Sequence, residues 1–170
     1  LMLHACKPGD NAAWMKIGGT TQGTTYRITY QTPDTTNFQE DIERTLKEFD
    51  QSLSTYIDTS LISRFNQGEV GLRPDTYFET CFNCAEEVYS ATGGAFDITV
   101  APVVNAWGFG FTERAETDSA MIDSLLAYIG MEKVEISGGL IKKTIPGVML
   151  DMNAIAQGYS VDLIGQFLES

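Results

Sequence analysis

The spacing of hydrophobic residues near the start of the chain is that of a β-strand. Tyr26, Ile28 and Tyr30 occupy every second position, which places them on one face of a strand within residues 14–30. Glycine and threonine residues at 18–24 interrupt this pattern. Glycine there permits either an ordinary hairpin turn or a close approach of the backbone to a ligand, and the pattern does not choose between them.

Helical spacing replaces strand spacing over most of the remaining chain. Apolar residues three and four positions apart predict amphipathic helices. A polar loop at 54–60 leads into a short helix, and either Asp58 or Ser60 is placed to cap its first turn. Gly93 and Gly94 give a later helix a C-terminal stop. The predicted helices span residues 37–53, 61–66, 77–91, 118–129 and 154–168.

The second half of the chain also contains short strand patterns. Residues 133–136 and 140–145 predict a strand pair that turns at Gly138 and Gly139, and an apolar run predicts a strand at 147–152. Strands and helices are thus interleaved along the chain. We therefore predict an α+β (mixed α/β) fold, in which a mixed sheet is flanked by helices.

The composition is that of a globular protein with one substantial core. The 170 residues are 43% hydrophobic and 20% charged. With 11 basic and 23 acidic residues the net charge is -12, which repels phosphate backbones and argues against nucleic-acid binding. Any other polyanionic ligand would need a metal ion or local dipoles to offset this charge. No run in the sequence approaches the ~20 apolar residues of a membrane span.

The first residues resemble the end of a bacterial lipoprotein signal. Leu3, Ala5 and Cys6 match its Leu-x-Ala-Cys pattern, with Cys6 as the lipidated residue, and a polar tether at 7–12 follows. The alternative, a terminal segment without meaning, stays open from the residues alone. Residues 1–12 are thus a candidate lipobox remnant and N-terminal tether.

The only Cys-x-x-Cys pair, Cys81 and Cys84, lies inside the helix predicted at 77–91. A redox pair is more plausible at a helix N-terminus, where the dipole lowers the pKa of a thiol. A zinc site needs more ligands, and His4 is the only histidine in the sequence. We therefore expect these two residues to be buried structural cysteines.

Two acidic residues, Asp97 and Asp151, lie within apolar runs rather than on polar faces. A buried carboxylate needs a partner, such as ligand donors or a metal ion. Asp151 directly precedes a predicted helix start at Asn153, where backbone N–H groups and the helix dipole favour an anion. This pairing suits a ligand with both hydrogen-bond donors and phosphates. The alternative is that Asp151 only caps the helix and Asp97 only satisfies a loop.

Four segments occur in the order and spacing of a known family. They are Thr21 to Thr24, Tyr56 with Ser60 to Asn66, Gly94 to Val100 followed by Trp107 to Gly110, and Leu150 to Asp162. Together they resemble the ApbE family, the FAD:protein FMN transferases. The resemblance covers 14–170 but only about the N-terminal half of the family domain. It implies an ApbE-like flavin transferase fold that is incomplete in this chain, with 13–170 as the N-terminal part of an FAD-binding catalytic domain.

The resemblance implies a set of ligand contacts but no catalytic residue within these positions. Gln22 stands where the family usually has methionine, and Gln157 replaces the lysine of its Lys-Gly-Tyr motif. The second change removes a cation near the ligand. The family's remaining Mg²⁺ ligands, an aspartate and a threonine, lie in its C-terminal half. The implied FAD contacts are Gln22, Tyr56, Ala95, Phe96, Asp97, Asp151 and Gln157, and the backbone carbonyl of Ala154 is the implied Mg²⁺ ligand.

The activity that the resemblance implies is Mg²⁺-dependent transfer of FMN from FAD to a threonine or serine hydroxyl of an acceptor protein, with release of AMP. Expected acceptors are flavoprotein subunits of membrane redox complexes or other exported flavoproteins. Family members act outside the cytoplasm and are often lipoproteins, which favours a lipid anchor on Cys6 and a periplasmic, membrane-anchored location. Two alternatives stay open: Mg²⁺-dependent hydrolysis of FAD to FMN and AMP, and a non-catalytic flavin-binding lipoprotein.

Overall fold

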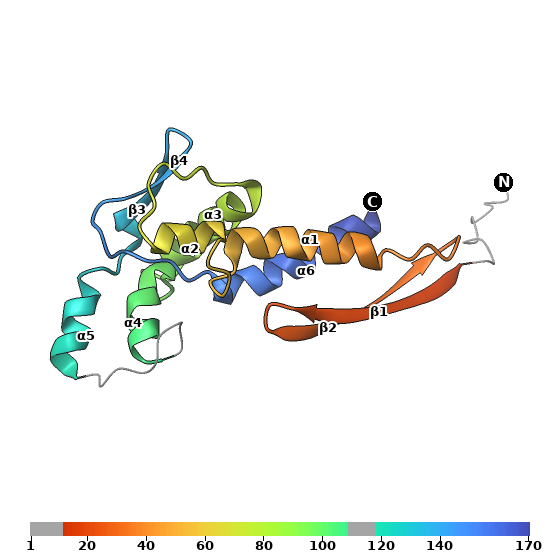
Figure 1. Ribbon diagram of the computed structural model, residues 1–170, viewed down its shortest axis with the longest axis horizontal. Coiled ribbons are helices and arrows are strands. Elements are labelled where there is room, and N and C mark those ends of the chain that lie inside the picture. The colour runs from red at the N-terminus through yellow and green to blue at the C-terminus, as the bar shows by residue number, and fades with distance from the viewer. Residues whose placement is uncertain (1–11, 109–117) are drawn as a thin grey trace, which may run out of the picture.

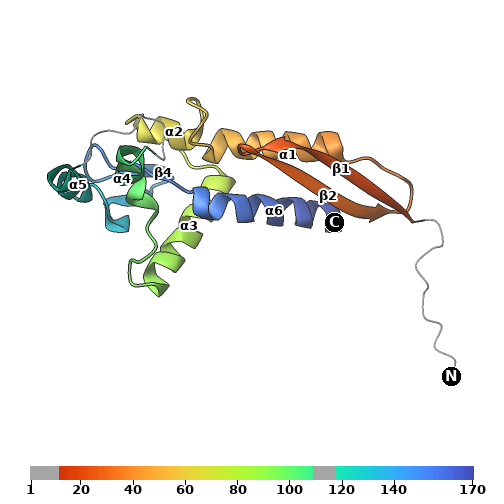
Figure 2. The ribbon, with the colours of Figure 1, turned by 90° about the horizontal axis from the view of Figure 1, so that it is seen from below.

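The computed structural model describes residues 12–108 and 118–170, which form an elongated α+β molecule. Its spine is a pair of helices, α1 (Gln39–Leu53) and α6 (Asn153–Glu169), which lie side by side along the long axis (Figures 1 and 2). The smaller helices and one short hairpin gather at one end of this pair, and a longer hairpin lies along the other end. Cys6 and the segment 109–117 lie outside the described residues.

The longer hairpin confirms one of the two interpretations of the glycine-rich segment. Strands β1 (Ala13–Thr21) and β2 (Thr24–Thr32) pair in antiparallel register. They are joined by Gln22 and Gly23, whose φ angles of 50° and 71° are both in the left-handed region. That backbone shape is typical of a two-residue turn, which matches the twist of the two strands. The inner face of the hairpin packs on the spine through Ile17 and Tyr30.

The helices follow the predicted apolar spacing closely. Besides α1 and α6, they include α2 (Leu61–Asn66), α3 (Thr76–Ala91) and α5 (Ser119–Leu126), the last shorter than predicted. Ser60, rather than Asp58, caps α2, since the Ser63 N–H donates to its hydroxyl at 3.1 Å.

The segment around Pro102, for which no regular element is predicted above, forms two short helical elements. These are η1 (Ile98–Val100) and α4 (Ala101–Ala106), and Pro102 lies in the first turn of α4. Proline is tolerated there because the first N–H groups of a helix have no partner within it. A second 3₁₀ turn, η2 (Met131–Lys133), precedes the short hairpin.

The core lies where α1, α2, α3 and α6 meet. Phe49 is 1% exposed and lies between two tyrosine rings, with centroids 5.5 Å away at Tyr77 and 5.7 Å away at Tyr159. These contacts join α1 to α3 and to α6, so one side chain holds three helices together. The main cluster also contains Leu53, Ile62, Phe65, Phe78, Phe82, Ile98, Val148, Leu150 and Met152.

Two details of the predicted β-structure are wrong, although the α+β class is right. The strands of the described residues form two separate antiparallel hairpins, the second being β3 (Val134–Ser137) with β4 (Leu140–Lys143), instead of one mixed sheet. The apolar run 147–152 is not a strand. Its backbone is satisfied by side chains: Asn66 donates to the Leu150 carbonyl at 2.9 Å and accepts from the Leu150 N–H at 2.7 Å.

The cysteine prediction holds for one residue only. Cys81 is buried, and burial, followed by the nearby Cys84, raises the pKa of its thiol to about 12, so it is inert. Cys84 is exposed, because the helix turns it away from the core. Within residues 12–108 and 118–170, no cluster of three or more histidine, cysteine or acidic residues is arranged to hold a metal ion. None of the helices described there is long and apolar enough to cross a membrane.

Candidate functional site

A polar pocket lies where the hairpin turn meets the spine. Its volume is about 150 Å³, and it brings together three of the predicted ligand contacts, Gln22, Tyr56 and Gln157. Gln22 comes from the turn of the hairpin, Tyr56 from the loop after α1, and Gln157 from the second turn of α6. The remaining lining residues are Phe49, Asp50, Leu53, Ser54, Asn153 and Ala156.

Gln22 brings an unused hydrogen-bond donor to this pocket. Its Oε1 accepts a long hydrogen bond from the Ser160 hydroxyl at 3.5 Å, but its buried Nε2 has no partner among the described residues. A buried donor without a partner costs roughly 1–3 kcal/mol. The chemistry of this donor fits a ligand such as FAD, whose ring carries carbonyl and nitrogen acceptors. Because the Nε2 atom is itself buried, the Gln22 side chain would have to turn into the pocket to reach them.

A groove runs beside the pocket between β2 and α6. Its volume is about 570 Å³, and its apolar floor includes Leu46, Ile164 and Leu168. Gln22 and Gln157 line both the pocket and the groove. The two glutamines therefore stand where the smaller pocket and the larger groove adjoin.

Asp50 is a pocket residue that the sequence did not single out. It lies on α1, where its spacing is that of an ordinary polar position, so no local pattern marks it. Its Oδ2 accepts from the Thr21 hydroxyl at 3.4 Å, which links α1 to the end of β1. Burial raises the pKa of this carboxyl above its ordinary 3.8, and the Thr21 hydrogen bond only partly opposes that effect.

We expect Asp50→Asn to stabilise the fold at pH 7 but not below about pH 3.8. The native state holds the Asp50 proton more tightly than the unfolded chain, because its pKa is raised from 3.8. The stability that the protonated acid contributes is therefore lost as the pH rises from 3.8 through the folded-state pKa. Asparagine does not titrate. Urea unfolding of both proteins at pH 3 and pH 7 measures the difference, and equal stability at pH 7 would contradict the prediction.

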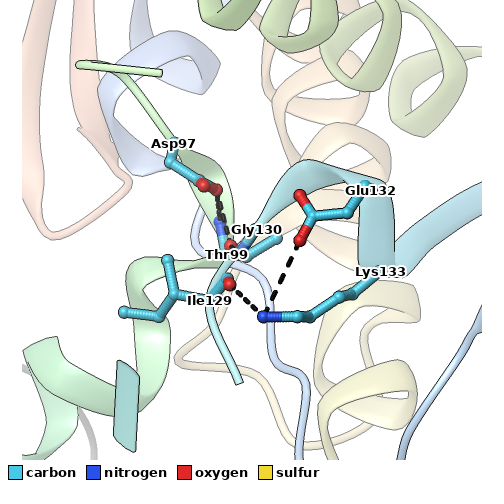
Figure 3. A network of polar contacts seen from close by, with 6 residues as sticks. All are labelled: Asp97, Thr99, Ile129, Gly130, Glu132 and Lys133. Carbon is cyan, nitrogen blue, oxygen red and sulfur yellow. Dashed lines mark hydrogen bonds and ion pairs between the residues drawn. The ribbon is translucent and has the colours of Figure 1, made fainter. Parts of the chain in front are cut away.

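Asp97 is half-buried, and one of its carboxylate oxygens accepts hydrogen bonds from its own loop. Its Oδ1 accepts from the backbone N–H of Thr99 at 2.7 Å and from the Thr99 hydroxyl at 2.6 Å (Figure 3). These bonds cap η1, so the alternative in which Asp97 satisfies a loop is correct for this oxygen. No hydrogen bond to Oδ2 is found within the described part of the chain, which leaves that oxygen for a ligand.

Asp151 likewise uses one carboxylate oxygen to accept a hydrogen bond from the residue two positions later, at the start of α6. It is half-buried, and its Oδ1 accepts from the Asn153 N–H at 2.8 Å. Its own backbone N–H donates to the Ile98 carbonyl at 2.7 Å. That bond places Asp151 beside η1. The structure thus joins the backbone of Asp151 to that of Ile98, which follows Asp97, and each acid has one carboxylate oxygen not hydrogen-bonded to any described residue.

The N–H groups at the start of α6 are less free than the sequence suggests. The Asn153 N–H is bound to Asp151, and the N–H groups of Ile155 and Ala156 both donate to the Met152 carbonyl, at 3.0 Å and 2.8 Å. Among the first four N–H groups of the helix, only that of Ala154 has no partner among the described residues. An anion at this helix end would therefore depend mainly on the helix dipole.

The remaining predicted contacts flank these two acids. Ala95 is exposed, and Phe96 packs partly buried against the main core cluster. Ala154 is exposed and is the second residue of α6. None of these three, nor Asp97 or Asp151, lines the 150 Å³ pocket.

Asn153 joins the two parts of the site, and the sequence analysis did not assign it a role. Its N–H binds Asp151, while its side chain lines the pocket and donates to the Thr55 hydroxyl at 3.5 Å. Its place between the acid and the helix was the only signal for it. The candidate site therefore extends from Asp97 and Asp151 across the start of α6 to Gln22.

Comparison with known proteins gives consistent matches to flavin transferases. The model of the ApbE family matches residues 22–170. A Vibrio cholerae protein named FAD:protein FMN transferase is 36% identical over 180 residues, which cover 100% of this chain and 53% of that protein. A Haemophilus influenzae protein of the same name is 32% identical over 183 residues, which cover 99% and 52%. The chain thus spans about half the length of these relatives.

Solved structures give the same result for the fold. The flavin transferase ApbE from Vibrio cholerae superposes with a TM-score of 0.86 at 34% identity, covering 93% of this chain and 54% of its own. The flavinyl transferase ApbE of Pseudomonas stutzeri superposes with a TM-score of 0.84 at 29% identity, covering 93% and 53%. The predicted ApbE-like fold is confirmed, and the chain belongs to the ApbE family.

Proposed function

We propose that the protein containing this chain is a Mg²⁺-dependent FAD:protein FMN transferase. The observation that supports this best is the hydrogen bond from the Asp151 N–H to the Ile98 carbonyl, which joins the segment of Asp97 to that of Asp151 at the start of α6. Relatives that carry the name FAD:protein FMN transferase match the entire chain.

The chain's own residues would bind and orient FAD. The open carboxylate oxygens of Asp97 and Asp151 are acceptors for ligand N–H or O–H groups, and Gln22 Nε2 is a donor for a ligand acceptor. The positive end of α6 favours the pyrophosphate. A net charge of -12 opposes an anionic ligand, so a cation is needed nearby.

The carbonyl oxygen of Ala154 would supply one Mg²⁺ ligand, since Mg²⁺ prefers oxygen donors. The described residues hold no complete metal cluster, so this site needs ligands from elsewhere. When bound, the ion would neutralise charge on the transferring phosphoryl group. In the transfer, the acceptor hydroxyl oxygen would bond to the phosphorus on the FMN side, and its proton would be released to water. The pyrophosphate P–O bond to AMP breaks, and AMP leaves.

One assay separates this proposal from its two alternatives. The full-length protein is incubated with FAD, Mg²⁺ and a threonine-containing acceptor peptide, and AMP release and peptide mass are followed. AMP together with a peptide that gains FMN supports the transferase. AMP without that gain favours hydrolysis, in which water replaces the hydroxyl. Bound FAD without AMP favours a non-catalytic flavin-binding protein. The reason for this alternative is that Gln22 and Gln157 replace the methionine and the lysine that are usual in the family.

We further propose that the protein is a lipoprotein held on the periplasmic side of the membrane through Cys6. The Leu-x-Ala-Cys pattern at 3–6 supports this, as does the polar tether at 7–12. Its acceptors would then be exported flavoproteins or flavoprotein subunits of membrane redox complexes. The division into tether and domain at 12/13 remains a prediction.

Cys6→Ala in the full precursor is expected to release the protein from membranes. A lipid chain partitions into the bilayer, and this variant has no thiol to carry it. Membrane and soluble fractions of cells expressing each form are compared by immunoblot, with Cys84→Ala as a matched control that should stay with the membrane. Persistent membrane association of the Cys6 variant would refute the anchor.

A further inference from the structure

The Thr99 side chain links Asp97 to a distant turn of the molecule. We propose that Thr99 is a positioning residue that fixes the Asp97 carboxylate for FAD binding. This inference rests on the proposed function, and nothing in the family comparison assigns a role to this residue.

The Thr99 hydroxyl can adopt only one orientation. The residue is 0% exposed, and its Oγ1 lies 2.7 Å from the backbone nitrogen of Gly130 and 2.6 Å from Asp97 Oδ1 (Figure 3). A backbone N–H only donates, so Oγ1 accepts at Gly130. The hydroxyl hydrogen is therefore directed at the Asp97 carboxylate. Together with the Thr99 N–H, it holds Oδ1 with two donors and fixes the side chain.

The far end of this link is itself a constrained turn. Gly130 has a φ of 138°, and a Cβ at this position would lie 2.2 Å from Glu132 Oε1. The turn is closed by Lys133, whose ammonium donates to the Ile129 carbonyl and lies 3.8 Å from Glu132 (Figure 3). Met131, directly after Gly130, is buried in the main core cluster. The hydroxyl is thus anchored to a turn that is held independently of Asp97.

The bonds to Oδ1 also fix the position of Oδ2, the second carboxylate oxygen of Asp97. With Oδ1 held by two donors, the carboxylate plane is set, and Oδ2 is presented to a ligand without further ordering. Ligand binding to a preorganised group loses less conformational entropy than binding to a mobile one. A purely structural role predicts something different: loss of the hydroxyl would then weaken η1 and the fold, whether or not residue 97 is an acid.

A double-mutant cycle in the full-length protein distinguishes these two roles. FAD affinity is measured by titration calorimetry at fixed Mg²⁺ for wild type, Thr99→Val, Asp97→Ala and the double variant. We expect Thr99→Val to weaken FAD binding about tenfold in the wild-type background and less than about twofold in the Asp97→Ala background. Thr99→Ser, which keeps the hydroxyl, should bind FAD within about twofold of wild type.

Each other outcome overturns a specific statement. Unchanged FAD affinity in Asp97→Ala would remove Asp97 from the FAD site and with it part of the proposed function. A weakened Asp97→Ala beside an unaffected Thr99→Val would leave that function intact and refute the positioning role. Equal losses from Thr99→Val in both backgrounds would indicate a structural role only. Should Thr99→Val not fold, Thr99→Ala replaces it in the cycle, and a loss of affinity in Thr99→Ser would refute the proposal by itself.

Discussion

Asp151→Ala is expected to weaken FAD binding by about ten- to one-hundredfold and to reduce FMN transfer accordingly. A hydrogen bond to a charged group contributes about 1.5–3 kcal/mol, and every 1.4 kcal/mol is a factor of ten. The variant also leaves the Asn153 N–H without its acceptor, which loosens the start of α6. FAD titration of the full-length protein, followed by AMP release, measures both effects.

Two further variants separate the charge of Asp151 from its contact with the helix. Asp151→Asn retains an oxygen for the Asn153 N–H but removes the charge, so we expect wild-type thermal stability with reduced FAD affinity. Asp123→Ala removes an exposed acid on α5 and should change neither. Unchanged FAD affinity in Asp151→Ala would count against the site assignment as a whole.

Phe49→Ala is expected to destabilise the protein by about 3–5 kcal/mol, which is a large part of the stability of a typical domain. The ring is 1% exposed and contacts both Tyr77 and Tyr159, so its removal leaves a cavity between three helices. Phe49 also lines the polar pocket, and FAD affinity should fall as α1 and α6 separate. Urea unfolding, monitored by circular dichroism, measures the stability change.

The control for this prediction is a phenylalanine near the surface. Phe167 is 36% exposed and makes one edge contact with Phe38 at a centroid distance of 5.5 Å. Phe167→Ala should therefore cost clearly less than Phe49→Ala. Phe49→Leu, which keeps most of the buried volume, should fall between them. Equal losses from the two alanine variants would contradict the central place of Phe49 in the core.

The helices of this protein could be predicted because their signals are local. The apolar residues of α1 recur at helical spacing, so residues that are close together in the sequence determine which face contacts the core. The same holds for α3, which ends at the glycines predicted to stop it. The cap of α2 was limited to two candidates, and the structure selects Ser60.

Errors arose where an extended segment has distant partners. The run 147–152 is apolar enough to be a strand, yet the Leu150 backbone is bound by the Asn66 side chain, 84 positions earlier. Hydrophobicity indicates burial but not which group satisfies the backbone. The prediction that Cys84 is buried is wrong for a related reason. The Cys-x-x-Cys spacing leaves open whether both cysteines of α3 face the core.

The sequence by itself determined the helices, the strand that contains Tyr26, Ile28 and Tyr30, and two acids in unusual apolar surroundings. That Gln22 and Gly23 form a hairpin turn was decided by the structure. Motif spacing also indicated the ApbE family. Only the tertiary structure decided that the segments carrying Asp97 and Asp151 lie side by side, through the bond from the Asp151 N–H to the Ile98 carbonyl. Only the structure showed that Thr99 donates to the Asp97 carboxylate and that Asn153 donates to the Asp151 carboxylate. Such contacts depend on the path of the whole chain, because residues far apart in sequence become neighbours only when the core packs.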